Sequence, residues 1–192
     1  IIKKKKKKKI ILKIVKPTLN ALRVKRKSYK GFLYVGLMIK NNEPFLIEYN
    51  IRMGDPECQA ILPRLKTDLV KIVQNTIKNK LKDTKILWSK NKSMTIVLCS
   101  KGYPNSYKKN LPIKNLSKIK LSKQSFVYHA GTKLIKDNLF SNGGRVLNIT
   151  SVGKNFLTIR NKIISIIKDL NWGHGFFRKD IGWRVINKNE SY

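Results

Sequence analysis

Two apolar runs joined by a short polar turn decide how the first part of the chain folds. The runs are YKGFLYVGLMI, from Tyr29 to Ile39, and PFLIEYNIR, from Pro44 to Arg52, and Asn41 and Asn42 lie between them. A continuous apolar run with aromatic residues is typical of a buried central strand, and neighbouring asparagines favour a tight turn. The two runs therefore predict an antiparallel hairpin.

Alternation along the second run separates polar from apolar side chains, because successive residues of a strand point to opposite faces. One face would carry Leu46, Glu48, Asn50 and Arg52, and the other Phe45, Ile47, Tyr49 and Ile51. A carboxylate and an amide oxygen two residues apart, about 7 Å along a strand, can converge on a hard cation. Arg52 on the same face could neutralise a transferring phosphoryl group.

The acidic residues are concentrated near this strand. The chain has only ten, yet Glu43, Glu48, Asp55 and Glu57 fall within fifteen positions. Oxygen ligands of this kind indicate Mg²⁺ or Mn²⁺ bound together with ATP as co-substrate. The alternative is an exposed, polar sheet face, since E-x-N-x-R is a short pattern with many accidental matches.

Helical patterns flank the hairpin. Apolar residues recur at helical spacing from Ile10 to Leu22, with Pro17 as a kink or boundary. After the hairpin, Thr67 can cap a helix whose apolar face runs from Leu69 to Leu81. The polar stretch that follows predicts a domain boundary between residues 84 and 85.

The second half of the chain has the pattern of a small β-rich domain. Short strands are predicted at Met94–Cys99, Phe126–Ala130 and Arg145–Thr150. One amphipathic helix is predicted from Asn155 to Leu170, with Gly173 just past its end. The whole pattern predicts an α+β fold of two parts, residues 10–84 and 85–192.

The formal net charge of +33 would ordinarily indicate nucleic acid or an anionic membrane as partner. However, 35 of the 43 cationic residues are Lys and only 8 are Arg. Nucleic-acid surfaces use Arg for bidentate contacts and interleave aromatic residues for stacking, and neither pattern is present. We interpret the charge as mostly a solvated surface, with a basic nucleic-acid-binding protein as the alternative.

The remaining composition indicates a cytoplasmic protein. Cys58 and Cys99 have no CxxC spacing, so they predict neither a disulfide framework nor a zinc site. No apolar run approaches the length of a transmembrane helix. The chain begins at Ile1, and Lys3–Lys9 is an unbroken homopolymer, which we interpret as an interrupted start. We expect residues 1–9 to be disordered.

Five blocks of sequence stand in one order along the chain. The longest is FLIEYNIRMGDPECQAILPRLKTDL, and the others are VLCSKGYPNSYKK, VYHAGT, SNGGRVLNITSVG and GFFRKDIGWR. Together they resemble the phosphoribosylamine–glycine ligase family of ATP-grasp enzymes, in which E-[FY]-N-x-R-x-GDPE-x-Q is close to a signature. The resemblance extends roughly from Ile14 to Val185. It implies the second half of an ATP-grasp domain (antiparallel sheet with helices), followed by the ligase C-terminal domain.

The resemblance also implies an activity. Such enzymes activate glycine with ATP as glycyl phosphate, and 5-phosphoribosylamine then attacks it to give glycinamide ribonucleotide in purine biosynthesis. Glu48 and Asn50 would hold the metal, and Arg52 would face the reacting phosphate. Without the amino-terminal part of such an enzyme, which supplies most adenine contacts, this chain alone should not catalyse. A decayed, inactive ligase is a further alternative.

Three residues are candidates for binding substrate through side chains. Asp55 and Glu57 follow the metal strand, where Asp55 could orient an ammonium group; the alternative is that they cap Gln59–Leu62. His129, in the HAGT block, could contact substrate, although a lone His at a strand end is more often a hydrogen-bonded structural residue.

A glycine turn supplies the last candidates. Gly143, Gly144 and Arg145 could wrap a phosphate, because glycine lets backbone N–H groups approach an anion closely. A tight hairpin turn explains the same three residues equally well.

Overall fold

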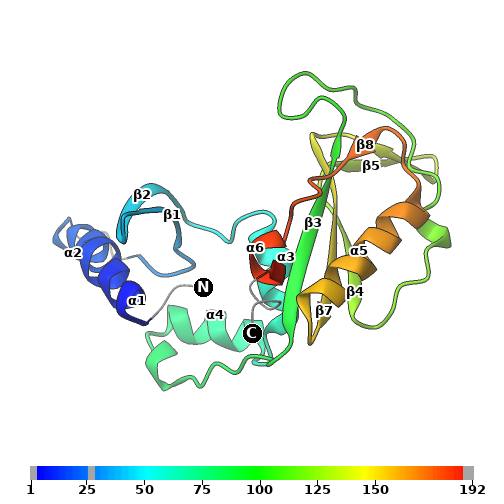
Figure 1. Cartoon of the computed structure of the whole chain (residues 1–192). Coiled ribbons are helices and arrows are strands. Elements are labelled where there is room, and N and C mark those ends of the chain that lie inside the picture. The colour runs from blue at the N-terminus through cyan, green and yellow to red at the C-terminus, as the bar shows by residue number, and fades with distance from the viewer. Residues whose placement is uncertain (1–3, 26–28, 188–192) are drawn as a thin grey trace. The chain divides into compact units, whose positions relative to one another are not determined.

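The computed structural model describes residues 4–25 and 29–187 (Figure 1). The chain divides into two compact units, and the division does not follow a single cut. The first unit comprises Ile1–Gly54 and Thr67–Ile86, and the second comprises Asp55–Lys66 and Leu87–Tyr192. The segment Asp55–Lys66, which we had placed with the first part, therefore packs with the second unit.

The first unit opens with a long helical segment interrupted before a proline. It consists of α1 (Lys4–Ile10), a π-helical stretch η1 (Ile11–Val15) and α2 (Lys16–Val24), with Pro17 in the first turn of α2. A proline inside a helix lacks an N–H and its ring clashes with the carbonyl four residues earlier, so the turn before it must widen. The irregularity predicted at Pro17 takes the form of this π turn.

The lysine run is helical, which corrects the disorder expected for residues 1–9. Helix α1 includes Lys4 to Lys9, while residues 1–3 lie outside the described part of the chain. Lysine is a good helix former, and this helix also has a tertiary partner. Lys9 and Lys13 both contact the Glu43 carboxylate, with Lys13 at 3.2 Å, and their ammonium groups lower the pKa of Glu43.

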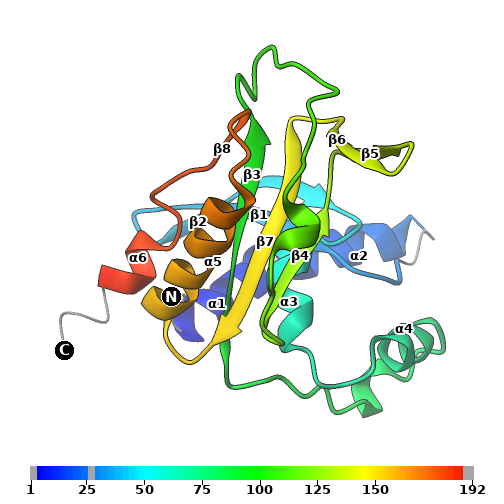
Figure 2. The same ribbon diagram turned by 90° about the vertical axis from the view of Figure 1, so that its right-hand side faces the viewer.

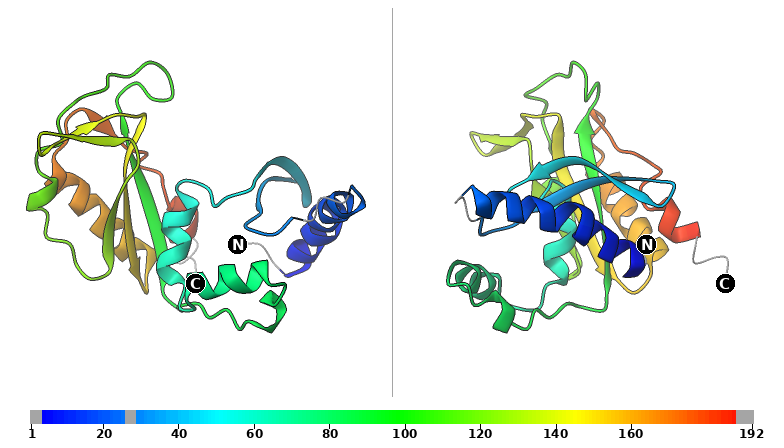
Figure 3. Two further views of the ribbon diagram at one scale, coloured as in Figure 1. Left: turned by 180° about the vertical axis from the view of Figure 1, so that it is seen from behind. Right: turned by 90° about the vertical axis from the view of Figure 1, so that its left-hand side faces the viewer.

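The predicted antiparallel hairpin is confirmed. Strand β1 (Tyr34–Lys40) pairs with β2 (Glu43–Asn50), and helix α2 lies alongside the pair (Figure 3). Asn41 and Asn42 both have positive φ, 49° and 61°, as the two central residues of a type I′ turn require.

The first strand is shorter and less buried than its composition predicted. It starts at Tyr34 rather than Tyr29, and within the described residues β2 is its only strand partner. Its side chains are half-buried or exposed, with Met38 57% exposed. The prediction of a buried central strand is therefore wrong for the described chain, because an apolar run does not reveal what covers it.

One helix and one short turn complete the first unit. Helix α4 (Leu69–Ile77) is followed by the 3₁₀ turn η3 (Leu81–Asp83). The cap is Asp68, whose carboxylate accepts a first-turn N–H at 2.8 Å, and not Thr67 as predicted. The Thr67 hydroxyl instead donates to a carbonyl of the following loop at 3.2 Å.

A four-stranded antiparallel sheet in the order β4-β7-β3-β8 forms the second unit (Figure 2). The strands are β3 (Lys92–Ser100), β4 (Ser125–His129), β7 (Arg145–Gly153) and β8 (Gly175–Phe176). The three predicted strands are confirmed. Strand β8 was missed because two residues give no periodic signal.

The remaining short elements were also not predicted. They are the hairpin of β5 (Thr132–Ile135) with β6 (Asn138–Ser141), helices α3 (Glu57–Ile61) and α6 (Trp183–Ile186), and the 3₁₀ turns η2 (Leu62–Arg64) and η4 (Leu116–Lys118). No helix within residues 4–25 and 29–187 is long and apolar enough to cross a membrane. Mixed helices and antiparallel sheets confirm the α+β prediction.

The predicted long helix is confirmed as α5 (Phe156–Leu170), which packs on the sheet (Figure 2). Its buried face interlocks with the strands through apolar side chains: Ile159, Ile163, Ile166, Ile167 and Leu170. The left-handed residue at its carboxyl end is Asn171, with φ 44°, so Gly173 is not the cap.

Asn155 fixes the amino end of this helix, and its removal should weaken the second unit. Its side-chain oxygen accepts the N–H groups of Leu157 at 2.7 Å and Thr158 at 3.2 Å. Asn155→Ala should lower the free energy of unfolding by about 1 kcal/mol, measured by urea denaturation. Asn155→Asp keeps the acceptor and is the matched control. Equal stability of the two variants would contradict the assignment.

Candidate functional site

The first candidate site lies on β2. Asn50 Nδ2 donates to Glu48 Oε1 at 3.0 Å, so the two side chains lie on one face, as alternation predicts for residues two apart. Glu48 is exposed and Asn50 half-buried. The structure thus brings the two residues predicted as metal ligands together, with the NH₂ group of Asn50 turned toward the Glu48 carboxylate.

A bulge and a glycine make room for Glu48. Gly36 pairs with Glu48, while Leu37 pairs with Leu46, so Ile47 is an extra residue in β2. Leu46 therefore does not continue the simple alternation that we predicted. A Cβ added to Gly36 would lie 2.8 Å from Glu48 Cγ. The Glu48 side chain therefore occupies the space over β1 that a side chain at position 36 would otherwise fill.

Arg52 lies beyond the strand. Strand β2 ends at Asn50, and Arg52 lies in a bend with its Nη1 donating to the carbonyl of Met53 at 3.0 Å. Alternation applies only inside a strand, so it does not place Arg52 on the Glu48 face. The shared face and the role of Arg52 toward phosphate stay predictions.

The Glu48–Asn50 pair fits a metal that other molecules help to coordinate. Among the described residues, no group of three or more His, Cys, Asp or Glu side chains is placed to hold an ion. Mg²⁺ commonly takes one or two protein oxygens and fills its octahedron with waters and phosphate oxygens. One carboxylate and one amide match that donor set.

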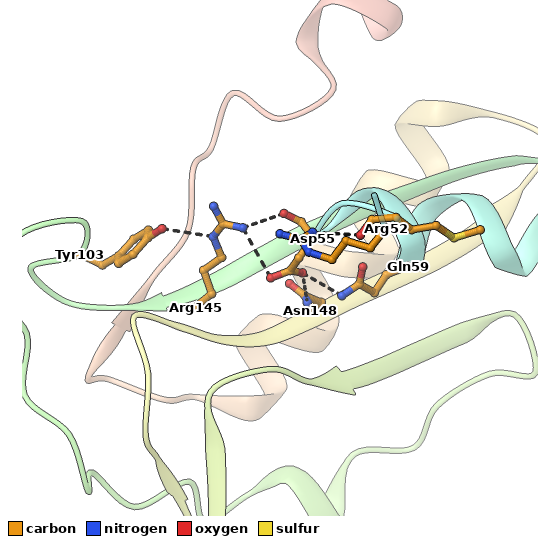
Figure 4. A network of polar contacts seen from close by, with 7 residues as sticks. Arg52, Asp55, Gln59, Tyr103, Arg145 and Asn148 are labelled. Carbon is orange, nitrogen blue, oxygen red and sulfur yellow. Dashed lines mark hydrogen bonds and ion pairs between the residues drawn. The ribbon is translucent and has the colours of Figure 1, made fainter. Parts of the chain in front are cut away.

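The second candidate site is a polar network in the second unit, around Asp55 (Figure 4). Asp55 Oδ1 accepts from Gln59 Nε2 at 2.8 Å and from Asn148 Nδ2 at 3.0 Å. Gln59 belongs to α3 and Asn148 to β7, so one carboxylate joins the helix to the sheet.

Arg145 at the start of β7 holds the same loop. Its Nη1 donates to the Asp55 carbonyl at 2.6 Å and lies 3.5 Å from Asp55 Oδ2, and its Nε donates to the Tyr103 hydroxyl at 3.2 Å. These contacts with Tyr103 and Asp55 raise the pKa of Arg145. Arg145 and Asp55, both predicted site residues, therefore lie together, while Tyr103 was missed.

Gln59 and Asn148 were also missed as site residues. Asn148 is fully buried in a strand that otherwise reads as apolar, RVLNIT. A buried amide in such a run is the sequence signal that could have identified it, because buried polar groups need partners. Gln59 was visible only as part of the GDPECQ block.

The glycines before β7 serve close backbone packing. Gly131 N donates to the Arg145 carbonyl at 2.8 Å, and Gly131 lies against Gly143. Gly144 lies against the Tyr103 ring. Strand β6 does not pair with β7, so the hairpin-turn alternative for Gly143–Arg145 is wrong. Phosphate binding there stays a prediction.

The last two candidates lie elsewhere in the second unit. His129 ends β4, where its Nδ1 lies 2.9 Å from Thr132 Oγ1, and it lines a cavity of about 650 Å³ beside the β5–β6 hairpin. Glu57 is half-buried at the first residue of α3. Substrate roles for both residues stay predictions.

Both cysteines have a raised pKa. Burial raises the pKa of Cys58 and of Cys99; the Arg145 guanidinium partly opposes this at Cys99, and the Asp55 carboxylate adds to it at both. A raised pKa lowers the thiolate fraction at neutral pH.

Comparison with known families agrees with these two sites. Residues 1–58, which hold the Glu48–Asn50 strand, match the model of the "Phosphoribosylglycinamide synthetase, ATP-grasp (A) domain". Residues 93–184, which hold Arg145 and Asn148, match "Phosphoribosylglycinamide synthetase, C domain". The first match includes the lysine run.

Individual relatives give the same result. The chain is 39% identical over 178 residues to phosphoribosylamine–glycine ligase of Agrobacterium fabrum, and 40% identical to the chloroplastic ligase of Arabidopsis thaliana. These alignments cover 93% and 92% of this chain but 42% and 34% of the relatives. The crystal structure of the Thermotoga maritima phosphoribosylamine–glycine ligase superposes with a TM-score of 0.78 at 26% identity, over 94% of this chain and 44% of that one.

The fold and the strand site define part of an ATP-grasp protein. More particularly, the chain belongs to the phosphoribosylglycinamide synthetase family. It spans less than half the length of the relatives named above.

The Gly131–Gly143 contact should tolerate no side chain. A Cβ on Gly131 would lie 2.5 Å from the Arg145 carbonyl oxygen and 2.6 Å from Gly143 Cα, and backbone cannot move aside cheaply. Gly131→Ala should therefore destabilise the protein by about 1–3 kcal/mol in urea denaturation. Gly173→Ala is the matched control, since nothing lies within 4 Å of its added Cβ. Equal loss in both variants would contradict the packing argument.

Proposed function

We propose that this chain takes part in the ATP-dependent ligation of glycine to 5-phosphoribosylamine, giving glycinamide ribonucleotide, ADP and phosphate. The relatives that it matches are named phosphoribosylamine–glycine ligases. The observation that carries the proposal is the Glu48–Asn50 pair, because its hydrogen bond fixes two oxygen-bearing side chains on one face of β2.

The chemistry needs charge neutralisation and positioning more than covalent catalysis. A glycine carboxylate oxygen attacks the γ-phosphorus of ATP, and ADP leaves. The nitrogen of 5-phosphoribosylamine then attacks the carbonyl carbon of glycyl phosphate, phosphate leaves, and the nitrogen loses a proton. Glu48 and Asn50 would hold Mg²⁺ or Mn²⁺, which neutralises phosphate charge when bound. Arg52 would stabilise the transferring group.

The second unit would contact the other substrates. Asp55 would orient an amino group, and Gly143, Gly144 and Arg145 would lie near a phosphate. Arg145 is already bound to the Asp55 loop and to Tyr103, so its contribution is to position that loop. Glu57 and His129 are assigned to substrate only through the family resemblance.

The relatives are more than twice as long as the matched region, and their other segments would supply most adenine contacts. The activity therefore belongs to the complete ligase, with this chain supplying the metal strand and the C domain. We propose a cytoplasmic location, although one relative is chloroplastic.

Glu48→Ala tests the metal assignment in the complete enzyme. Loss of the carboxylate should lower kcat/KM by about a hundredfold or more, because charge on the phosphates is no longer neutralised in place. The fold should persist, since Glu48 is exposed on the strand surface. Asp169→Asn, an exposed change on α5, is the control. Undiminished turnover of Glu48→Ala would sink the metal assignment.

Gly36→Ala tests whether the position of Glu48 depends on the absence of a side chain at Gly36 of β1. The new methyl group would displace Glu48 Cγ, so the Mg²⁺ concentration needed for half-maximal activity should rise while the free energy of unfolding changes little. An unchanged Mg²⁺ requirement would show that the position of Glu48 does not depend on this contact.

A further inference from the structure

We infer that the Tyr103 hydroxyl donates a hydrogen bond to an oxyanion of a substrate, and that Arg145 Nη2 contacts the same oxyanion. The group is the phosphate of 5-phosphoribosylamine or the carboxylate of glycine, so the inference rests on the proposed function. It adds Tyr103 as a residue that binds substrate. It also gives Arg145 a contact with substrate beyond its hold on the Asp55 loop.

The direction of one hydrogen bond leaves a donor on Tyr103. Arg145 Nε lies 3.2 Å from the Tyr103 hydroxyl oxygen. A guanidinium nitrogen only donates, so the tyrosine oxygen is the acceptor and its own O–H hydrogen points elsewhere. Among residues 4–25 and 29–187, the hydroxyl forms no second hydrogen bond. The bond to Arg145 is exposed, so a ligand can reach the hydroxyl from solvent.

Arg145 presents a second donor beside this hydroxyl. Its Nη1 donates to the Asp55 carbonyl and its Nε to Tyr103, whereas Nη2 has no partner in the described part of the chain (Figure 4). The N–H of Nε and one N–H of Nη2 point along the same edge of the planar guanidinium, so Nη2 lies within about 5–6 Å of the Tyr103 oxygen. Two oxygens of one phosphate or carboxylate can span that gap. The Arg145 side chain is 43% exposed, which leaves this edge accessible.

Packing against the protein holds the Tyr103 ring in place. A Cβ on Gly144 would lie 2.1 Å from Tyr103 Cδ2, so the ring occupies the space over that glycine. The Tyr103 N–H donates to the carbonyl of Ser100 at 3.1 Å. Ser100 is fully buried, and its N–H and hydroxyl donate to the carbonyls of Gly144 and Gly143 at 2.8 and 2.9 Å. The two donors are therefore positioned before a ligand arrives, which lowers the entropy cost of binding.

The charge at this edge favours an oxyanion. The one carboxylate that approaches Arg145 among the described residues is Asp55, at 3.5 Å from Nη1, on the other side of the guanidinium from Tyr103. Arginine binds carboxylate and phosphate through parallel donors, and here the tyrosine O–H takes the place of the N–H on Nε. The lysine-rich surface attracts any anion, whereas two directed donors also select its geometry.

Tyr103→Phe in the complete ligase that carries this chain tests the inference, because it removes the O–H and keeps the ring on Gly144. The Michaelis constant should rise about tenfold for the substrate whose oxyanion is bound, with kcat and the constant for ATP changed by less than about twofold. Isothermal titration with ribose 5-phosphate and with acetate, at about 0.15 M salt to screen the lysines, measures phosphate and carboxylate binding without turnover.

Tyr107→Phe is the matched control. Its ring packs edge-on against Tyr103 at 6.2 Å between centroids, and its hydroxyl has no hydrogen bond within the described ranges. This variant should change neither Michaelis constant nor probe affinity, although it removes the same atom from the same loop.

A double variant separates donation to substrate from support of the guanidinium. If Tyr103 acted only by holding Arg145, Tyr103→Phe would have no further effect in an Arg145→Met background. Direct donation predicts a further loss of probe affinity of about threefold or more. If Arg145→Met does not fold, Arg145→Lys takes its place as the background, since it keeps the charge and lacks the Nε donor.

The outcomes distinguish this inference from the proposed function. Weaker binding of ribose 5-phosphate in Tyr103→Phe assigns the site to phosphate, weaker binding of acetate assigns it to carboxylate, and either supports the inference. Such a loss in an enzyme that performs no ligation would support the site and overturn the proposed function. Unchanged probe affinities and Michaelis constants in Tyr103→Phe, a rise confined to ATP, or no further effect in the Arg145 background would overturn the inference and leave the proposed function intact.

Discussion

The Asp55 carboxylate is the contact on which the second unit's site depends. It lies five residues after the end of β2 in sequence, yet its hydrogen bonds run to a helix residue, Gln59, and to a sheet residue, Asn148. Arg145 holds the backbone of the same residue. Because one acceptor orients two amides and fixes the end of a loop, loss of this carboxylate would release helix, strand and loop together.

The fold was predictable wherever local physics decides it. Asn41 and Asn42 tolerate positive φ, which set the hairpin, and a three-to-four-residue period marked α5. The predictions failed where contacts with other side chains decide the structure. The cap of α4 is Asp68 and not Thr67, and the lysine run is helical and contacts Glu43. Short strands such as β8 exist only because a partner strand is already in place.

The candidate site residues were predictable from the sequence only where they lie close together along the chain. Glu48 and Asn50 lie two apart on one strand, so their common face could be read from the sequence. Asn148 is 93 positions from Asp55, and no pattern joins them. For Arg52, alternation was carried two residues beyond the end of the strand, where it no longer determines which face a side chain takes. What the sequence does hold is the anomaly of an amide inside RVLNIT.

Net charge gives a physical reason why a contact with an amino group, as proposed for Asp55, requires a carboxylate. A field set by +33 attracts ATP and phosphates to any lysine-rich face, so anion binding alone carries little selectivity. The same field repels a substrate ammonium. Only a local, correctly oriented set of acceptors can overcome that repulsion, because its hydrogen bonds act at contact distance while the distant lysines are screened by salt. Asp55 is one of only ten acidic residues in the chain, which is the physical reason for proposing it as the acceptor of a substrate amino group.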